Sequence, residues 1–300
     1  MTTQPTIGAT VSRIQLGRHL QELRERAKLS LRKVAEELEV SAAKWSRVEN
    51  GETSVRSLDV AHACRIFGVA DDELVHSLMD LAKQTKAKSW LDSYADVVSE
   101  HFAMYIELEA AASQLTWYET DLVPGLLQTR EYASGIMAIE RFTGTELDAA
   151  DLERRLQVRL TRQKILTRES GAPVLRVVLG EAALHRRIGG PTTMAGQLAH
   201  LLKTARLGNV EIRLMPLERE HAGLTTGPFI VLDFPPRGNG RLIEPSTVYI
   251  DGYAGFLYLQ EPEQVELYQA VWTNVWDTAL TARQSIDCIK QRLKELQQVG

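Results

Sequence analysis

The sequence contains little cysteine and no long apolar run. Only Cys64 and Cys288 occur among its 300 residues, and they fall in different predicted domains. We therefore expect no disulfide framework, and this usage fits a cytoplasmic protein. No segment approaches the roughly 18 uninterrupted apolar residues that a membrane-spanning helix needs. The opening segment MTTQPTIGATVS has neither a basic region nor an apolar block, so we expect no secretory signal there.

The short motifs that often mark catalysis are also missing. The sequence has no glycine-rich phosphate loop, no GxSxG elbow and no HExxH zinc motif. Glu181 and His185 lie four residues apart on a predicted helix and can share a metal ion. Without a third nearby ligand, a helix-surface pair is the favoured interpretation. We expect no enzyme activity, no bound metal and no cofactor.

Charge is present but unevenly distributed. The net charge is −4, yet residues 13–56 carry ten Lys or Arg against seven Asp or Glu. Residues 57–300 carry 25 against 32. A mildly basic segment thus precedes a larger acidic one, which weakly favours DNA binding. Any non-specific affinity for DNA should be modest and sensitive to salt.

Residues 29–52 predict two short helices joined by a tight turn. One apolar face recurs at helical spacing, formed by Leu31, Val34, Ala35 and Leu38. Ser41 is placed to cap a second helix, which carries Trp45 and Val48 on its inner side. Asn50 and Gly51 should end that helix. Two helices joined by a three-residue turn are typical of a helix-turn-helix.

Three further helices complete a five-helix domain that we expect over residues 12–82. Leu16, Leu20 and Leu23 define the first of them. Ser57 is expected to cap the fourth, which Gly68 ends, and Asp71-Asp72 should cap the fifth. The inner faces of the last two helices comprise Val60, Ala63, Cys64, Phe67, Leu74, Leu78 and Leu81. Cys64 is therefore expected to be a buried core residue.

This arrangement resembles the XRE-type, or Cro/phage-repressor, family of helix-turn-helix regulators. The matching stretches are Leu31–Ala35, Leu38, Val40-Ser41, Trp45–Gly51 and Phe67–Val69. Two positions depart from the family pattern. Glu39 replaces the usual turn glycine and is expected to adopt a strained positive φ. Trp45 replaces the usual Ile or Leu and needs a roomier core.

The resemblance implies roles for individual residues in DNA binding. Arg32 matches a position that contacts a backbone phosphate, and Arg47 matches one that faces the major groove. Arginine can pair with guanine, whereas alanine can only touch a thymine methyl. Because Ala42 and Ala43 occupy reading positions, Lys44 and Arg47 should supply most polar contacts to the bases. Glu49 is expected to be structural. The full set of predicted DNA-binding residues is Arg32, Lys33, Ser41, Ala42, Ala43, Lys44, Ser46, Arg47 and Asn50.

A helical connector over residues 83–105 is expected to lead into a mixed α/β (α+β) C-terminal domain, residues 106–300, that ends in helices. Residues 106–116 read as its first helix, and residues 152–166 as a basic helix with a solvated face. Predicted strands cover residues 174–179, 210–215, 229–234, 247–251 and 253–259. Two helices, each with one apolar face, should close the chain.

The C-terminal domain resembles the Scr-family, antitoxin-like domain of actinobacterial helix-turn-helix regulators. The match rests on Tyr118-Glu119, Val123–Thr129, Arg162-Gln163, Leu179–Leu184, Gly189–Pro191 with Met194, Gln197-Leu198 and Val248-Tyr249. Members of this family are often paired with a small partner protein. The resemblance thus implies control of the chain through such a partner.

We conclude that the sequence favours a cytoplasmic, homodimeric, sequence-specific transcriptional regulator of double-stranded operator DNA. It would associate with the nucleoid when bound, and a small protein partner would act through its C-terminal domain. An alternative is a sensor of a small-molecule effector, with a pocket lined by Trp117, Tyr118, Tyr132, Phe229, Tyr253, Phe256 and Tyr258. We favour a core role for these aromatics. Glu218, Glu220 and His221 form a polar loop that can border such a pocket or bind the partner.

Overall fold

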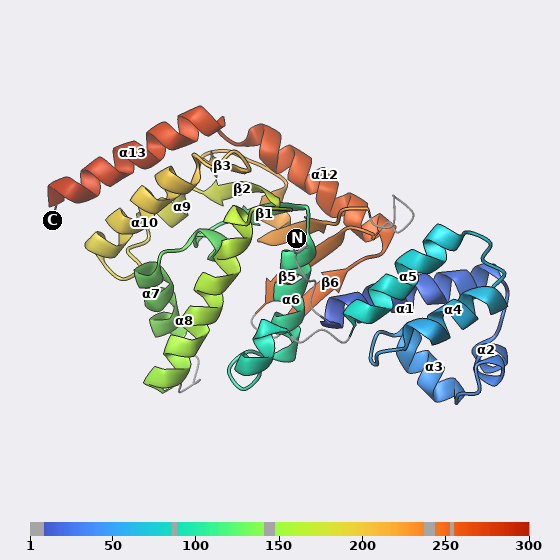
Figure 1. Ribbon diagram of the computed structural model, residues 1–300. Coiled ribbons are helices and arrows are strands. Elements are labelled where there is room, and N and C mark those ends of the chain that lie inside the picture. The colour runs from blue at the N-terminus through green and yellow to red at the C-terminus, as the bar shows by residue number, and fades with distance from the viewer. Residues whose placement is uncertain (1–8, 86–88, 141–147, 237–243, 253–254, 300) are drawn as a thin grey trace. The chain divides into compact units, whose positions relative to one another are not determined.

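The computed structural model describes residues 9–85, 89–140, 148–236, 244–252 and 255–299 (Figure 1). The chain forms two compact units. The first comprises residues 1–95, 99–111 and 234–244, and the second comprises residues 96–98, 112–233 and 245–300. The predicted boundary at residue 106 lies inside α6 (Glu100–Ala111), which belongs to the first unit. Among the described helices, none has an apolar stretch long enough to cross a membrane.

The first unit contains the five helices that the sequence predicts. They are α1 (Ala9–Arg26), α2 (Leu31–Glu37), α3 (Ala42–Glu49), α4 (Ser57–Ile66) and α5 (Asp72–Gln84). Their apolar faces form one core, which includes Leu16, Val34, Val60 and Leu78. Helix α1 begins before the predicted start of the domain at residue 12. The 3₁₀ helix η1 (Trp90–Tyr94) and α6 then follow.

One cap in this unit was predicted wrongly. The N-cap residue of α4 is Arg56, and no side chain caps this helix. Ser57 is instead the first helical residue. Asp71 does cap α5, because its side chain accepts hydrogen bonds from the amides of Glu73 and Leu74. Gly68 adopts φ 73° just after α4, a conformation that glycine tolerates well.

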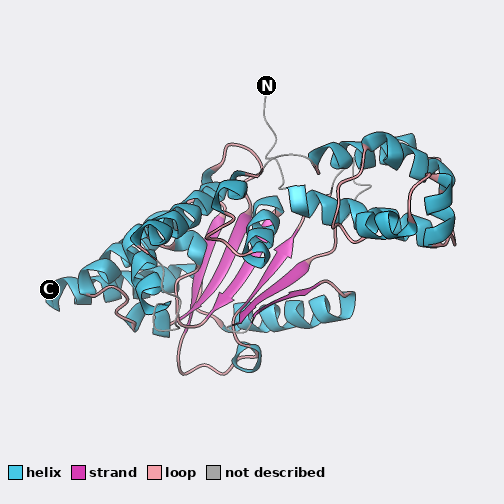
Figure 2. Cartoon of the chain, turned by 90° about the horizontal axis from the view of Figure 1, so that it is seen from below, coloured by secondary structure: helices cyan, strands magenta, loops and turns pink. Residues whose placement is uncertain are grey.

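The second unit is built around a six-stranded mixed sheet, which Figure 2 shows in magenta. The strands lie in the order β3-β2-β1-β4-β5-β6. Strands β1, β2 and β3 are parallel, whereas β4, β5 and β6 continue the sheet antiparallel. The strand bounds are β1 (Gln114–Glu119), β2 (Val174–Gly180), β3 (Val210–Met215), β4 (Phe229–Asp233), β5 (Thr247–Gly252) and β6 (Gly255–Leu259).

Strand β1 lies in the middle of the sheet and contradicts the predicted helix over residues 106–116. Helix α6 ends at Ala111, and the chain turns into the sheet at Gln114. Thr116, Trp117 and Tyr118 are good strand formers, and β1 pairs with β2 on one side and β4 on the other. The alanines before them extend the helical pattern in the sequence, which hides the start of the strand.

Helices cover the sheet and its β3 edge. The remaining α-helices are α7 (Arg130–Glu140), α8 (Ala149–Gln163), α9 (Ala182–His185), α10 (Pro191–Thr204), α11 (Gly223–Thr226), α12 (Pro262–Thr278) and α13 (Ala282–Val299). Helix α12 packs Val265 and Val275 onto sheet residues such as Val178 and Phe229. At the β3 edge, Ser285 of α13 accepts the Leu214 amide at 2.8 Å, and the Leu280 amide donates to the Leu214 carbonyl. These contacts satisfy backbone groups that an edge strand leaves free.

The aromatic residues proposed for a pocket are mostly core. Trp117, Tyr118, Tyr132 and Phe229 are buried. The Phe229 ring lies edge-on to Tyr268 of α12, with 5.0 Å between ring centroids. Phe256 and Tyr258 are half-buried, and Tyr253 lies outside the described residues. Burial of this kind fits the favoured core role.

Residues 123–129, VPGLLQT, contain the short 3₁₀ helix η2 (Gly125–Leu127) and are held by side-chain amides. The Gln163 Nε2 donates to the carbonyls of Gly125 and Gln128, at 3.0 and 2.7 Å. Gln197 donates to the Leu127 carbonyl and accepts from the Thr129 amide, both at 2.7 Å. Glutamine can do both because its amide carries a donor and an acceptor. These contacts supply the hydrogen bonds that a buried segment outside helix and sheet otherwise lacks.

The basic face of α8 is not solvated, contrary to expectation. Arg155 Nε donates to the Val97 carbonyl at 3.0 Å, and Arg159 donates to the Gln128 side chain at 3.0 Å. Arg154 pairs with Asp96, and Arg162 is buried. Neighbouring loops of the second unit therefore use these arginines, which a helical pattern in the sequence cannot show.

Glu119 ends β1 in a half-buried position, and its carboxyl generates a pH prediction. Burial raises the pKa of its carboxyl to about 7, although the Thr120 amide donates to it at 3.0 Å. The pKa of Glu119 is therefore higher in the folded state than in the unfolded state, so the protonated carboxyl favours folding. This contribution to the free energy of unfolding is complete below pH 4.5, the usual Glu value, and is lost as pH rises through 7.

We expect Glu119→Gln to remove this pH dependence, because glutamine stays neutral. In urea unfolding of the second unit, the free energy of unfolding of the variant should rise relative to that of the wild type between pH 5 and 7.5. The exposed Glu169→Gln change is the matched control and should follow the wild type. A constant difference between Glu119→Gln and wild type over this range would refute the prediction.

Candidate nucleic-acid interface

Helices α2 and α3 have the caps and turn that the sequence predicts. The Ser30 hydroxyl accepts from the Lys33 amide, and the Ser41 hydroxyl accepts from the Lys44 amide, each at 3.2 Å. Between the helices, Glu39 adopts φ 54°, the left-handed conformation expected at this glycine-like position. Gly51 follows α3 with φ 72° and ends the motif.

Helix α3 is seated directly on the backbone of α1. A Cβ atom added to Gly17 would lie 2.3 Å from the Glu49 carbonyl oxygen. One added to Gly51 would lie 2.7 Å from the Ile14 Cα. No side chain fits at either contact, so α3 is held at a fixed distance from α1. Trp45 and Val48 are buried on this inner side.

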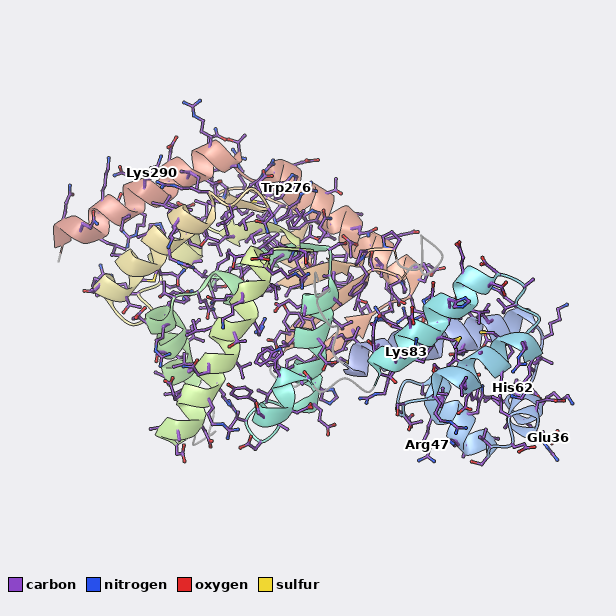
Figure 3. All side chains as sticks on the ribbon, in the orientation of Figure 1. Glu36, Arg47, His62, Lys83, Trp276 and Lys290 are labelled. Atoms are coloured by element: carbon purple, nitrogen blue, oxygen red, sulfur yellow. The ribbon has the colours of Figure 1, made fainter. Side chains whose placement is uncertain are left out.

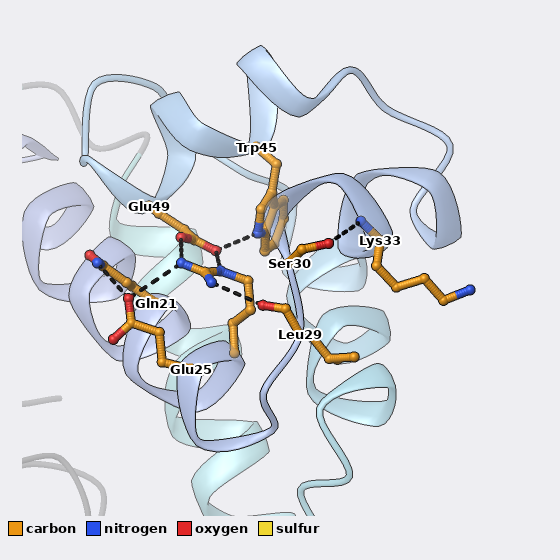
Figure 4. A network of polar contacts seen from close by, with 8 residues as sticks. Gln21, Glu25, Leu29, Ser30, Lys33, Trp45 and Glu49 are labelled. Atoms are coloured by element: carbon orange, nitrogen blue, oxygen red, sulfur yellow. Dashed lines mark hydrogen bonds and ion pairs between the residues drawn. The ribbon is translucent and has the colours of Figure 1, made fainter.

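A buried ion pair joins the same two helices (Figure 4). Arg24 of α1 donates through two nitrogens to both carboxylate oxygens of Glu49, each at 2.8 Å. Trp45 Nε1 donates to Glu49 Oε1 at 2.7 Å, and Arg24 also donates to the Leu29 carbonyl at 3.0 Å. The side chains of Arg24 and Glu49 are 11% and 4% exposed. The hydrogen bond that Arg24 donates to Glu49 raises the pKa of Arg24, so the guanidinium stays charged.

The structure places the predicted contact residues on the outer surface of α2 and α3. Figure 3 shows Arg47 projecting from α3. Ser46 is half-buried, and the others are exposed, namely Arg32, Lys33, Ser41, Ala42, Ala43, Lys44, Arg47 and Asn50. Ala43, Lys44 and Arg47 share one face, because residues three and four apart are neighbours on a helix. This face has the small and cationic residues that a major groove accepts.

The cations of this surface differ in how they are paired. Arg32 forms an ion pair with Glu36 at 3.0 Å, and Lys33 forms one with Glu37 at 2.7 Å. The Glu37 hydrogen bond raises the pKa of Lys33, whereas Lys33 lowers that of Glu37. Within the described ranges, Lys44 and Arg47 form no ion pair. These two therefore carry the unneutralised charge of α3.

Reactive side-chain types also occur outside α2 and α3, at the Glu181–His185 pair, at Cys64 and at His221. His185 Nε2 lies 4.0 Å from Glu181 Oε1, and both side chains are substantially exposed, as the surface-pair interpretation predicts. No group of three or more His, Cys, Asp or Glu that can hold a metal occurs in the described part of the chain. Burial raises the pKa of the Cys64 thiol to about 11, which keeps it protonated. His221 lies edge-on to Tyr118, with ring centroids 5.6 Å apart.

Comparison with known families gives two matches. Residues 102–291 match the family described as "Domain of unknown function (DUF5753)", which covers more than half of the chain. The chain belongs to the DUF5753 family. Residues 15–78 match a helix-turn-helix domain and span all of α2, α3 and α4. The matched helix-turn-helix supports a DNA-binding regulator. Comparisons with curated proteins and with solved structures give no match.

The sequence of this DUF5753 chain predicts the exposed surface of α2 and α3, but not all of the α1 residues that hold α3 in place. Gly17 of α1 has no predicted role, and the sequence places Arg24 on a basic outer face of that helix with Arg13, Arg18 and Arg26. The structure instead buries Arg24, and both Gly17 and Arg24 hold α3 in place. Glycine in a helix interior is unfavourable, so Gly17 was a detectable signal of close packing. Arg24 had no such signal, because an arginine on an amphipathic helix is usually solvated.

We predict that Arg24→Met destabilises α3 by about 3–5 kcal/mol, because it leaves Glu49 buried without a counter-charge. Native-state hydrogen exchange of the α3 amides measures this free energy of opening. Arg26→Met is the matched control: Arg26 is 75% exposed and pairs with Glu22 at 3.5 Å, so less than about 1 kcal/mol is expected. Equal effects of the two substitutions would show that the buried pair does not hold α3.

Proposed function

We propose that the chain is a sequence-specific, XRE-type transcriptional regulator that binds operator DNA through α3. The observation that carries this proposal is the outer face of α3, where Lys44 and Arg47 are exposed and unpaired among described residues. The arginine fork matches guanine O6 and N7, and Ala42 and Ala43 can approach thymine methyls. Arg32 and Lys33 would contact phosphates after exchanging their partners Glu36 and Glu37.

The small number of polar base-readers argues for two copies on one operator. Each good bidentate contact contributes about 1–3 kcal/mol of discrimination, and one α3 offers few of them. Helix-turn-helix proteins commonly bind paired half-sites as dimers. We infer a homodimer that binds a two-fold operator, with the DUF5753 part pairing the copies and receiving an antitoxin-like small protein. The chain would be cytoplasmic, nucleoid-bound with its operator, and not an enzyme.

Substitution of the two unpaired cations tests the DNA contact. Arg47→Ala and Lys44→Ala should each weaken operator binding by about 10- to 100-fold, as loss of a base contact does. Arg32→Ala should weaken binding to all sequences and reduce the salt slope by about 1. The control is Arg65→Ala on the exposed side of α4. Gel-shift titrations in which Arg47→Ala and Lys44→Ala both match Arg65→Ala would exclude this binding mode.

The oligomeric state and the partner need a separate experiment. Sedimentation of the purified chain should give twice the mass of one chain. Affinity capture of the native protein, followed by mass spectrometry, should recover a small protein in stoichiometric amount. A monomer, or the absence of any co-purifying protein, would contradict these two parts of the proposal. Thermal stabilisation by a metabolite without a protein partner would favour the ligand-sensor alternative.

A further inference from the structure

Helix α1 is buried on two different faces. One face supplies Leu16 and Leu20 to the apolar core of the helix-turn-helix. The other is polar, and its residues Ser12, Gln15 and His19 are nonetheless buried. Their spacing places them together on one side of the helix. An all-polar buried face is unusual for such a helix, since burial of polar groups is costly unless they are hydrogen-bonded.

Two buried carboxylates meet α1 at this side. Glu107 of α6 accepts from the Val11 amide at 3.2 Å, in the first turn of α1, where amides lack helical partners. Glu244 accepts from Arg18 at 2.9 Å, and its other oxygen lies 2.8 Å from His19 Nε2. The Glu244 side chain is only 2% exposed. We call Ser12, Gln15, Arg18 and His19 with Glu107 and Glu244 the polar seam.

The polar seam contains hydrogen-bonding groups that are not all satisfied. Ser12 Oγ and Gln15 Oε1 are buried, and neither has a hydrogen-bond partner among the described residues. A buried polar group without a partner loses its hydrogen bonds to water and gains none in the protein, which destabilises the folded state. A network that is only partly satisfied therefore separates at a lower cost than the packed leucines on the other face of α1.

Both carboxylates lie on segments that continue directly into the sheet. Helix α6 ends at Ala111, and β1 begins at Gln114. Glu244 precedes β5, which begins at Thr247. A change in either strand is therefore transmitted by a very short length of chain to the polar seam. The same part of α1 carries Gly17, on which α3 is seated.

We propose that the polar seam is a regulatory joint through which the DUF5753 part controls DNA reading. When the seam is closed, Glu107 holds the first turn of α1, Glu244 holds its middle, and α1 in turn holds α3. Opening of the seam loosens Ile14 and Gly17 against α3 and lowers operator affinity. This inference rests on the proposed function, because it assumes that α3 is the DNA-reading helix.

The test is Glu244→Gln in the full chain, which removes the charge and keeps the shape. Hydrogen exchange of the α3 amides should become at least about fivefold faster, and operator affinity should fall at least about fivefold, within the range of known allosteric couplings. Exchange in β1 and β2 should not change. Glu100→Gln on α6 is the matched control, because Glu100 is exposed and forms no ion pair with any described residue.

A second variant and the two readouts separate the possible failures. Glu107→Gln weakens the cap on Val11 and should shift α3 exchange in the same direction by a smaller factor. If α3 exchange in Glu244→Gln equals that of Glu100→Gln, the seam does not support α3 and the proposal is overturned. Faster exchange with equal or higher operator affinity also overturns it. If wild type binds no DNA, the proposed function fails, whereas the exchange data still test the joint.

Discussion

The position of α3 depends on a buried ion pair and a glycine contact, both supplied by α1. Arg24 and Glu49 bond through two parallel hydrogen bonds, and the Trp45 indole donates to the same carboxylate. Bidentate pairing fixes orientation as well as distance, because the guanidinium and the carboxylate are planar. Gly17 sets how closely the two helices approach. Together these contacts direct Lys44 and Arg47 outward, where charge can act on DNA.

In the second unit, glutamine side chains supply hydrogen bonds to the backbone of residues 123–129. Its VPGLLQT segment is neither helix nor strand over most of its length, so its backbone needs partners from elsewhere. Gln163 and Gln197 provide them from α8 and α10. These contacts give the motif a structural explanation: it is held in place by amide side chains from distant helices. Arginines of α8 serve nearby loops in the same way.

Helix α1 thus takes part in more than the helix-turn-helix core. One side is apolar and packs with the other helices of the first unit, while another is polar and faces Glu107 and Glu244. The two sides differ in their contacts. The apolar face is closely packed, whereas the polar face retains buried groups that have no hydrogen-bond partner among the described residues. A helix with two such unequal sides is suited to remain folded while one of its contacts changes.

The sequence by itself determined the parts whose signals are local. Ser41 as a cap, Asn50 and Gly51 as a stop, and the positive φ of Glu39 all follow from the chemistry of one or two residues. The same holds for the apolar faces of α4 and α5, for Cys64 in the core, and for all five predicted strands, apart from residues 253–254, which lie outside the described residues. The roles of the nine candidate DNA-binding residues stay predictions, although the structure exposes eight of them.

Only the tertiary structure decided the features that depend on distant partners. Strand β1 was read as helix because its identity comes from pairing with β2 and β4, which lie about 60 and 115 residues further along the chain. The arginines of α8 and Arg24 looked solvated because their acceptors are remote in sequence. The N-cap residue of α4 is Arg56 and not the predicted Ser57. Local capping preferences do not define a helix start to within one residue. Hydrogen bonds and close approaches between distant segments have no periodicity, so a single sequence does not reveal them.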